Sequence, residues 1–413
     1  DFPAALLGRC YSSWPVSLDG ATSISAASGP TYGGEAWTIQ VDYQHGPTRI
    51  FPSVSGSPRD GAWLDNSVDN SLIFDLLGSG TETAGTLGRP LALALLGTNV
   101  PAATLYGWDG ASWVSVLAWS AALTTGAAWS RTGRMLTITS GGSGGVVAFV
   151  VRNQAAGCWV DLGGGKLRKI VKNTEGMLGS SSPFPAIFEL EGVDGTEGAS
   201  GSCTFYVSQG VAVAAQPTQY RRYKLTIPAA STPEGYAVVG TALLGSLAVL
   251  GRRPSNGRDI DLSYQAQTNR PPGGPRSWRR LAPEIQRWSL DFGDLYPSSQ
   301  IYGSSPDYVS LSTAGVPNAA LHAHALSVRG IVQELSGEYV LYCGAVPQVT
   351  SNTTTTMLTN GNFLAFGRLT EPGTLSIVRG TESQSEVYQL RGVVLDRKST
   401  RLNSSHTVIS YAV

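Results

Sequence analysis

The stretch Ser71–Trp119, SLIFDLLGSGTETAGTLGRPLALALLGTNVPAATLYGWDGASWVSVLAW, decides the fold. Ser71–Leu76 is a strand-forming run. Pro90–Leu96 is almost entirely apolar, which is typical of a strand that is buried on both faces. Ala103–Gly107 and Trp113–Trp119 predict two further strands. The whole stretch therefore predicts one layer of a β-sheet.

The last two of these strands are joined by the turn Trp108-Asp109-Gly110-Ala111-Ser112. An Asp-Gly pair supplies the positive φ that a tight hairpin requires, because glycine has no Cβ to clash in that conformation. We therefore expect a β-hairpin here. Its turn carries Trp108 and Asp109, which are candidate ligand-binding residues if the loops at this end of the fold meet a ligand.

Three features of this stretch belong together: a strand ending in Phe74-Asp75-Leu76, a buried strand closing in Leu96–Asn99, and the hairpin sequence YGWDGASW. A matching second half lies far downstream at Gln219–Ser246, QYRRYKLTIPAASTPEGYAVVGTALLGS. Together they resemble the discoidin-type (coagulation factor 5/8 C-terminal) jelly roll, in the form found in tail proteins of tailed bacteriophages. Discoidin modules serve many tasks, so the resemblance indicates a fold more than a function.

The resemblance implies an all-β, multidomain protein with a discoidin-like jelly-roll sandwich. It predicts that the sandwich closes by pairing Ser71–Leu76 or Leu91–Leu96 with Tyr223–Ile227 or Ala237–Leu244. The expected organisation is an N-terminal β docking segment (1–61), the jelly roll (62–246) with a β-rich insertion at about 120–218, and a β-rich C-terminal domain (247–395).

Composition agrees with a large β protein. A chain of 413 residues exceeds the usual size of a single core, so two or three domains are expected. Fifty glycines, ten tryptophans and a charged fraction of 14% are typical of a loop-rich β protein. The net charge of zero gives no electrostatic case for a nucleic-acid or membrane partner. No apolar run of membrane-spanning length and no leader sequence is apparent, so we expect no membrane span.

Residues 396–413, DRKSTRLNSSHTVISYAV, differ abruptly from what precedes them. They resemble a translated sequencing adapter: the adapter bases encode Asp396–His406, an index follows, and further adapter bases encode Ile409–Val413. The alternative is a genuine basic, Ser-rich tail. We expect this segment to be non-native, so that the given sequence does not show the native C-terminal sequence beyond about Leu395.

Two glycine-rich stretches mimic catalytic motifs. Residues 141–145 satisfy G-x-S-x-G, but a nucleophile elbow needs a strand, a sharp turn and a helix, and a second strand is expected here instead. Gly163-Gly164-Gly165-Lys166 lacks the first glycine of a P-loop, and Leu167 stands where a magnesium-binding Ser or Thr is needed. Both are interpreted as hairpin turns.

Neither metals nor cofactors are predicted. The four cysteines are far apart in the sequence and show no zinc-ligand spacing, so they are interpreted as buried thiols. His322 and His324 would share one face of a strand, but no suitable third ligand is nearby, which favours a packing role over a metal site.

Leu247–Arg287 is the most basic stretch, with eight arginines against three acidic residues. Aromatic platforms among arginines can bind glycans or nucleic acids. Subunit contact is favoured instead, because Arg and Trp are also enriched at protein interfaces. The candidate binding residues here are Trp278, Arg279, Arg280 and Trp288.

The resemblance implies a structural virion protein of a tailed bacteriophage, at the tail tip, baseplate or fibre attachment, assembled in the cytoplasm of the bacterial host. Its partners would be other tail subunits, including copies of itself in a symmetric assembly, and it could contact host surface polysaccharide. The alternative is a carbohydrate-binding, lectin-like module without an assembly role. A glycan-degrading enzyme ranks third, because no cluster of carboxylates suggests one; we expect no enzymatic activity and no nucleic-acid partner.

Overall fold

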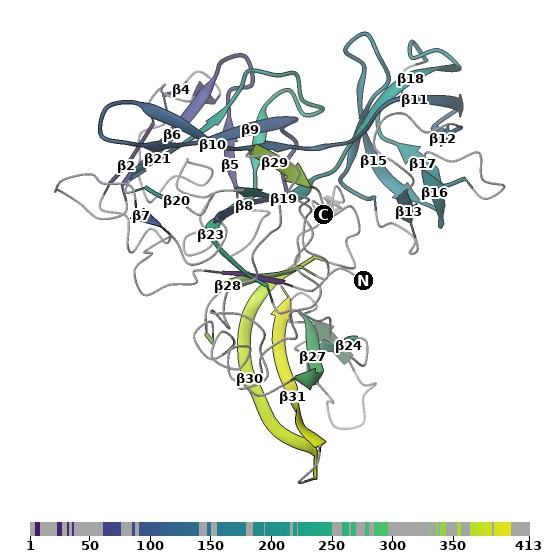
Figure 1. The fold of residues 1–413 in the computed structure, drawn as a ribbon. Helices are drawn as coiled ribbons and strands as arrows, with labels where there is room; N and C mark the ends of the chain where they lie inside the picture. Colours follow the sequence, from purple (N-terminus) through teal and green to yellow (C-terminus); the bar gives the residue numbers. More distant parts are fainter. Residues whose placement is uncertain are drawn as a thin grey trace.

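The computed structural model shows an all-β protein, as the sequence predicts (Figure 1). Figure 1 shows a sandwich at upper left, a barrel at upper right and a long strand pair below. The structure describes residues 5–8, 23–26, 31–32, 35–36, 61–75, 85–86, 91–139, 147–149, 155–178, 185–193, 195–214, 218–220, 222–249, 258–263, 266–269, 277–280, 285–295, 332, 336–337, 339–343, 353–356, 364–381 and 384–397.

The first layer of the sandwich is a five-stranded antiparallel sheet. Its strand order is β10-β9-β21-β6-β2. The strands are β10 (Trp113–Ser120), β9 (Ala102–Trp108), β21 (Arg222–Ile227), β6 (Asn70–Asp75) and β2 (Ser23–Ala26). β21, from the downstream stretch Gln219–Ser246, thus lies between β9 and β6, which belong to the stretch around Ser71–Trp119.

The second layer is formed by β8 (Leu91–Leu96), which lies between β19 (Gln209–Ala214) and β23 (Thr241–Val249). Every residue from Ala92 to Val100 is buried. This confirms the prediction that β8 is covered on both faces.

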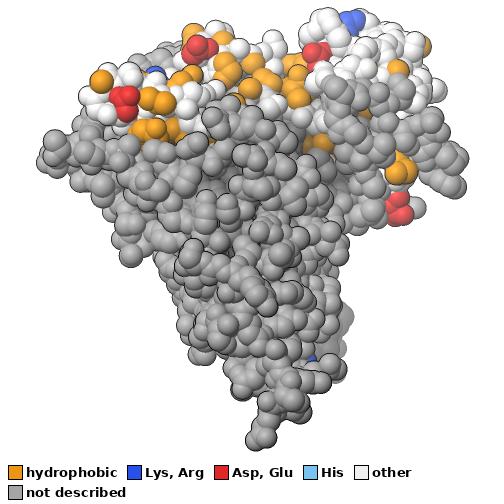
Figure 2. Space-filling model, viewed as in Figure 1, with side chains coloured by type: hydrophobic (Ala, Val, Ile, Leu, Met, Phe, Trp, Pro, Cys, Tyr) orange, Lys and Arg blue, Asp and Glu red, His pale blue; other side chains and the backbone are white. Residues whose placement is uncertain are grey.

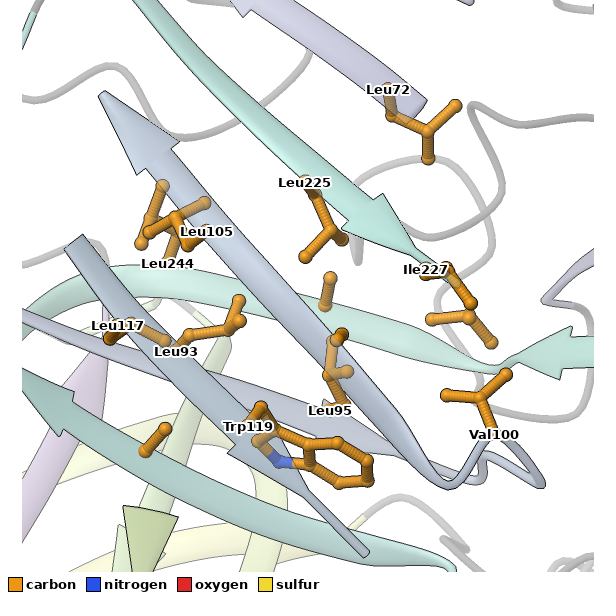
Figure 3. Close-up of a cluster of buried hydrophobic side chains, with 14 of the residues drawn as sticks. Leu72, Leu93, Leu95, Val100, Leu105, Leu117, Trp119, Leu225, Ile227 and Leu244 are labelled. Carbon is orange, nitrogen blue, oxygen red and sulfur yellow. The ribbon is translucent and has the colours of Figure 1, made fainter. Parts of the chain in front are cut away.

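A hydrophobic core fills the space between the two layers (Figure 3). β9 and β21 contribute Leu105 and Leu225 from one side, and β8 contributes Leu93 and Leu95 from the other. Each is at most 1% exposed, and burial of a leucine side chain contributes about 1.5–3 kcal/mol. The rest of the cluster comprises Ala62, Leu64, Leu72, Val100, Ala103, Val116, Leu117, Trp119, Ala121, Ala212, Ala214, Tyr223, Ile227, Ala237, Val239, Ala242 and Leu244.

The predicted closure of the two halves is confirmed. β21 pairs with β6, with Leu225 opposite Leu72, and β23 pairs with β8, with Leu244 opposite Leu93. The Leu96–Asn99 motif explains part of this closure. Thr98 Oγ1 donates to the carbonyl of Val238 at 2.7 Å, so the end of β8 is tied to the strand that precedes β23.

Between β10 and β19 the chain forms a closed six-stranded barrel. Its strand order is β11-β12-β17-β15-β14-β18, closed by pairing between β18 and β11. The strands are β11 (Ala122–Thr132), β12 (Met135–Ile138), β17 (Ile187–Leu190), β15 (Leu167–Asn173), β14 (Trp159–Asp161) and β18 (Ser200–Tyr206). Its own core includes Trp129, Phe188 and Phe205, so side chains fill the barrel.

The second layer of the sandwich continues into the strands of the C-terminal region. The ten-stranded sheet has the order β24-β27-β31-β30-β28-β1-β23-β8-β19-β29. The added strands are β24 (Arg258–Ser263), β27 (Ile285–Leu295), β31 (Gln384–Arg397), β30 (Leu364–Thr381), β28 (Tyr339–Cys343), β1 (Ala5–Gly8) and β29 (Thr353–Thr356). The N-terminal strand β1 joins the two regions, because it pairs with β23 on one side and β28 on the other.

Five short antiparallel pairs complete the described strands. They are β3 (Thr31–Tyr32) with β4 (Glu35–Ala36), β5 (Ala62–Leu64) with β22 (Ala237–Val239), β7 (Gly85–Thr86) with β20 (Thr218–Gln219), β13 (Val147–Phe149) with β16 (Gly176–Leu178), and β25 (Ala266–Asn269) with β26 (Ser277–Arg280).

Three local predictions need correction. β12 and β13 flank the G-x-S-x-G stretch but pair with other strands, so the predicted hairpin between them is wrong. From Phe363 onward the sequence predicts three closing strands, Phe363–Leu369, Gly373–Val378 and Glu386–Leu395, but the structure has two long ones, β30 and β31. The glycine and proline of Pro372–Gly373 do not end β30, because its pairing with β31 continues in regular register, with Pro372 opposite Val393 and Thr374 opposite Arg391. β31 continues through Asp396 and Arg397, two residues past the end of the predicted strand Glu386–Leu395.

Candidate functional site

The outer face of the five-stranded sheet carries an unusual set of side chains. Along β9, Ala103, Leu105 and Gly107 are buried and point into the sandwich. Tyr106 and Trp108 alternate with them and lie half-exposed on the opposite face. Two aromatic rings on the solvent side of a sheet are unusual, because that side normally carries polar side chains.

Neighbouring strands extend this feature into a cluster that we call the aromatic face: Tyr106, Trp108, Trp113 and Lys224. Trp113 of β10 lies directly opposite Trp108, with ring centroids 5.3 Å apart and a 60° angle between the planes. Lys224 of β21 lies opposite Tyr106. Its ammonium is 4.9 Å from the ring centroids of both Tyr106 and Trp113, so one cation contacts two π faces.

Hydroxyl groups follow on the same outer face. Thr226 lies opposite Thr104 in β9 and opposite Ser71 in β6, and its hydroxyl is 3.1 Å from the Ser71 hydroxyl. Ser115, opposite Tyr106, is exposed. The face therefore combines aromatic surface, one cation and a row of groups that can donate and accept hydrogen bonds. Figure 2 shows hydrophobic side chains gathered on the upper surface, above β9 and β10.

The predicted hairpin turn is confirmed, and Asp109 holds it together. Gly110 has a φ of 100°, and Asp109 Oδ1 accepts the N–H groups of Ala111 and Ser112 at 2.8 and 2.7 Å. These backbone donors, that of Ser112 foremost, lower the pKa of Asp109 below its ordinary value. Of the two candidates in this turn, Trp108 belongs to the aromatic face, whereas the carboxylate of Asp109 is engaged by its own turn.

Tyr220 closes the sandwich beneath the same end of the sheet. Its ring occupies the space that a Cβ on Gly107 would need, and it meets the Tyr223 ring edge-on with centroids 6.0 Å apart. Burial, followed by the nearby charge of Asp109, raises the pKa of Tyr220. Gly107 therefore allows Tyr220 to support the strand that carries Tyr106 and Trp108.

The four arginine and tryptophan candidates from the basic stretch lie in two different sheets. Trp278, Arg279 and Arg280 belong to β26, which pairs with β25. Trp288 belongs to β27 and lies opposite Ile260 on one side and Leu395 on the other. The strand pairings thus do not place Trp288 in one sheet with the other three.

The structure also places several other residues that the sequence analysis singled out. Cys158 and Cys203 are buried free thiols, as predicted. Gly163–Lys166 forms the predicted hairpin turn, between β14 and β15. His322 and His324 lie outside the described residues, as do Ser140–Gly145.

Among the residues that the structure describes, no group of three or more His, Cys, Asp or Glu could hold a metal ion. In that same part of the chain, no helix is long and apolar enough to span a membrane.

Comparison of the chain with models of known protein families, with curated sequences and with solved structures gave no match. The geometry itself therefore defines the class: an all-β protein in which a two-layer sandwich carries an inserted barrel and an exposed aromatic face.

Sequence reasoning missed Tyr106, Trp113 and Lys224 as a site. A signal was present, since Tyr106 and Trp108 alternate with small or apolar residues in AATLYGW. Lys224 could not be added from sequence, because its place beside Tyr106 depends on pairing between strands that lie far apart in the chain.

Proposed function

We propose that this chain is a non-enzymatic structural subunit of a tailed-bacteriophage virion that contacts host surface saccharides through the aromatic face of a discoidin-like sandwich. Two observations support the fold. The motifs around Leu96–Asn99 and Gln219–Ser246 resemble that family, and β6 and β8 pair with β21 and β23 as a jelly roll built from these halves requires. The virion context rests on the sequence resemblance.

The observation that carries saccharide binding is the aromatic face. A pyranose ring has a flat apolar side of C–H groups and a rim of hydroxyls. Aromatic rings such as Trp108, Trp113 and Tyr106 offer a complementary apolar surface with little conformational entropy to lose. Ser115 and the hydroxyls of Thr104 and Thr226 can exchange hydrogen bonds with the rim. A site of this kind binds without catalysing a reaction.

The test is binding of the full chain to an array of bacterial surface oligosaccharides. We expect retention of a subset of them, and Trp113→Ala should reduce affinity about ten-fold, as loss of an interfacial tryptophan does. Trp63→Ala is the matched control, because Trp63 is a half-buried tryptophan of β5, outside the five-stranded sheet. Its ring packs on Tyr236, with centroids 5.0 Å apart. Equal loss in both variants at equal stability would contradict the proposal, and so would a wild-type chain that binds no saccharide.

The assembly role draws on a second observation. β30 and β31 form a long arm, with β27 paired along part of β31, that extends away from the sandwich and the barrel (Figure 1). An arm of this kind can pair with a neighbouring subunit. Mass photometry and negative-stain imaging of the purified chain test this role. Symmetric oligomers or tail-like particles would support it, whereas a monomer at all concentrations would favour a carbohydrate-binding module without an assembly role.

A further inference from the structure

We infer that the aromatic face selects a saccharide bearing a negative group, a carboxylate or a phosphate, and that Lys224 is the residue that recognises it. This inference rests on the proposed function and adds the chemical class of the ligand.

Lys224 is placed by the sheet rather than by a charged partner. Its neighbours Tyr223 and Leu225 are buried in the core, so the Lys224 side chain must point to the outer face. There its ammonium contacts the rings of Tyr106 and Trp113. Among the described side chains, no carboxylate forms an ion pair with it.

Other lysines of the described region are arranged differently. Lys169 pairs with Glu234 at 2.9 Å and Lys172 with Glu189 at 3.4 Å, and Lys166 donates to the carbonyl of Thr196. Lys224 thus presents a positive charge that the described fold does not neutralise, within an apolar surround. An ammonium in such a place gains most from an anionic partner, because aromatic neighbours reduce competition from water.

Other charged residues lie near the edge of the aromatic face. Asp109 lies at the end of β9, but its Oδ1 atom is held by the turn. Arg222 precedes Lys224 by two positions in β21 and lies opposite Asp75 of β6. The row that crosses the middle of the face contains Ser115, Tyr106 and Lys224. We place the negative group of the ligand in this row and its sugar ring against Trp108 and Trp113.

The experiment compares three probes by calorimetry with the full chain: an oligogalacturonate, the same oligosaccharide with its carboxylates reduced to hydroxymethyl groups, and a phosphomannan oligosaccharide. We expect at least one charged probe to bind about ten-fold more tightly than the reduced one, as one charge-assisted hydrogen bond provides. Preference for oligogalacturonate would identify a carboxylate, and preference for phosphomannan a phosphate.

Three variants test whether Lys224 causes the preference for a charged probe. Lys224→Met keeps the apolar stem on the rings and removes the charge, so the affinities for charged and reduced probes should become equal. Lys224→Arg should retain the preference. Lys172→Met removes one exposed charge from the barrel and should leave the preference unchanged. Equal binding of charged and reduced probes by the wild-type chain would overturn this inference and leave the proposed function standing. Binding of no saccharide would overturn both.

Discussion

The ammonium of Lys169 lies 2.9 Å from Oε1 of Glu234 and joins the barrel to the sandwich. Lys169 belongs to β15, whereas Glu234 lies in the loop before β22. The other carboxylate oxygen of Glu234 accepts the side-chain N–H of Asn99 at 2.6 Å. One carboxylate therefore connects the barrel, the loop after β8 and the loop that carries Gly235-Tyr236.

The Lys169–Glu234 ion pair forms a junction between the barrel and the sandwich, and it predicts a measurable coupling energy between these two residues. Both side chains are largely shielded, at 16% and 20% exposed, so a double-mutant cycle with Lys169→Met and Glu234→Gln should give about 1 kcal/mol in urea denaturation. The control cycle uses Lys172 and Glu189, which are 66% and 29% exposed and should couple by less than about 0.5 kcal/mol. Equal coupling in the two cycles would contradict the structural role of the junction.

Asn99 should be costly to replace. Its Nδ2 donates to Glu234 and to the carbonyl of Tyr236, and its Oδ1 accepts the N–H of Val238 at 2.7 Å. Asn99→Ala removes these three hydrogen bonds and takes the side-chain acceptor away from the buried N–H of Val238, so we expect a loss of about 3 kcal/mol in the free energy of unfolding. Asn66→Ala removes one side-chain hydrogen bond, to Thr232, and should cost about 1 kcal/mol. A smaller loss for Asn99 than for Asn66 would argue against this network.

Glu197 should stabilise the barrel. Its side chain is fully buried, and its carboxylate lies 2.7 Å from Arg168 Nε and 3.7 Å from an Arg131 nitrogen. Glu197→Gln leaves two shielded guanidinium groups without their anion, and we expect a loss of about 3 kcal/mol in thermal or urea unfolding. Glu191→Gln, which removes an exposed carboxylate of the same loop, should change stability by less than about 0.5 kcal/mol. Similar effects of the two substitutions would refute a buried ion cluster.

The buried thiols predict a loss of stability at alkaline pH. Burial raises the pKa of Cys158 to about 11 and that of Cys203 to about 12, from an ordinary value near 9.0. Above pH 9 the unfolded chain releases these protons while the folded chain retains them, so stability falls with rising pH, by up to about 1.4 kcal/mol per pH unit for each thiol.

Urea denaturation between about pH 8 and about pH 9.5 measures this slope below the ordinary range of tyrosine titration. The double variant Cys158→Ala and Cys203→Ala should show a flatter dependence than the wild-type chain. An unchanged slope would mean that the two thiols titrate alike in both states.

Gly107 and Tyr220 should be coupled through space. A methyl group at Gly107 meets the Tyr220 ring, so Gly107→Ala should cost about 1–3 kcal/mol by overpacking. Tyr220→Ala removes the obstacle, and the double variant should be more stable than the sum of the two single losses predicts. Additive losses, measured by thermal unfolding, would show that Gly107 is required for another reason.

Much of the sandwich could be predicted because its signals are local. The apolar run Leu91–Leu96 and the Asp-Gly turn before Trp113 fix strand positions by themselves, and the motif around Tyr223 identified the partner strand. The long strands β30 and β31 could not be predicted as such. The residues Pro372 and Gly373 normally end a strand, and only pairing with β31, which lies far from them in a sequence window, carries β30 past them.

The aromatic face, likewise, could be predicted from the sequence only in part. Trp108 was found because it lies beside a turn, whereas Trp113, Tyr106 and Lys224 form a site only through registers between three strands. Likewise, no sequence pattern indicates that β12 pairs with β11 and β17 and leaves β13 to pair with β16. Long-range pairing is set by the packing of the whole core, which a single sequence window does not contain.

The inserted barrel leaves and re-enters the sandwich at adjacent points. The N–H of Val207 donates to the carbonyl of Ala121 at 2.9 Å, so the chain returns beside the residue from which it departed. A folded barrel thus holds β10 and β19 close together. When the sandwich folds, it then closes a short loop instead of a long flexible one, which reduces the entropic cost of loop closure. The barrel is then expected to fold before the sandwich and to accelerate it, so a variant that slows barrel folding should delay refolding of the whole chain.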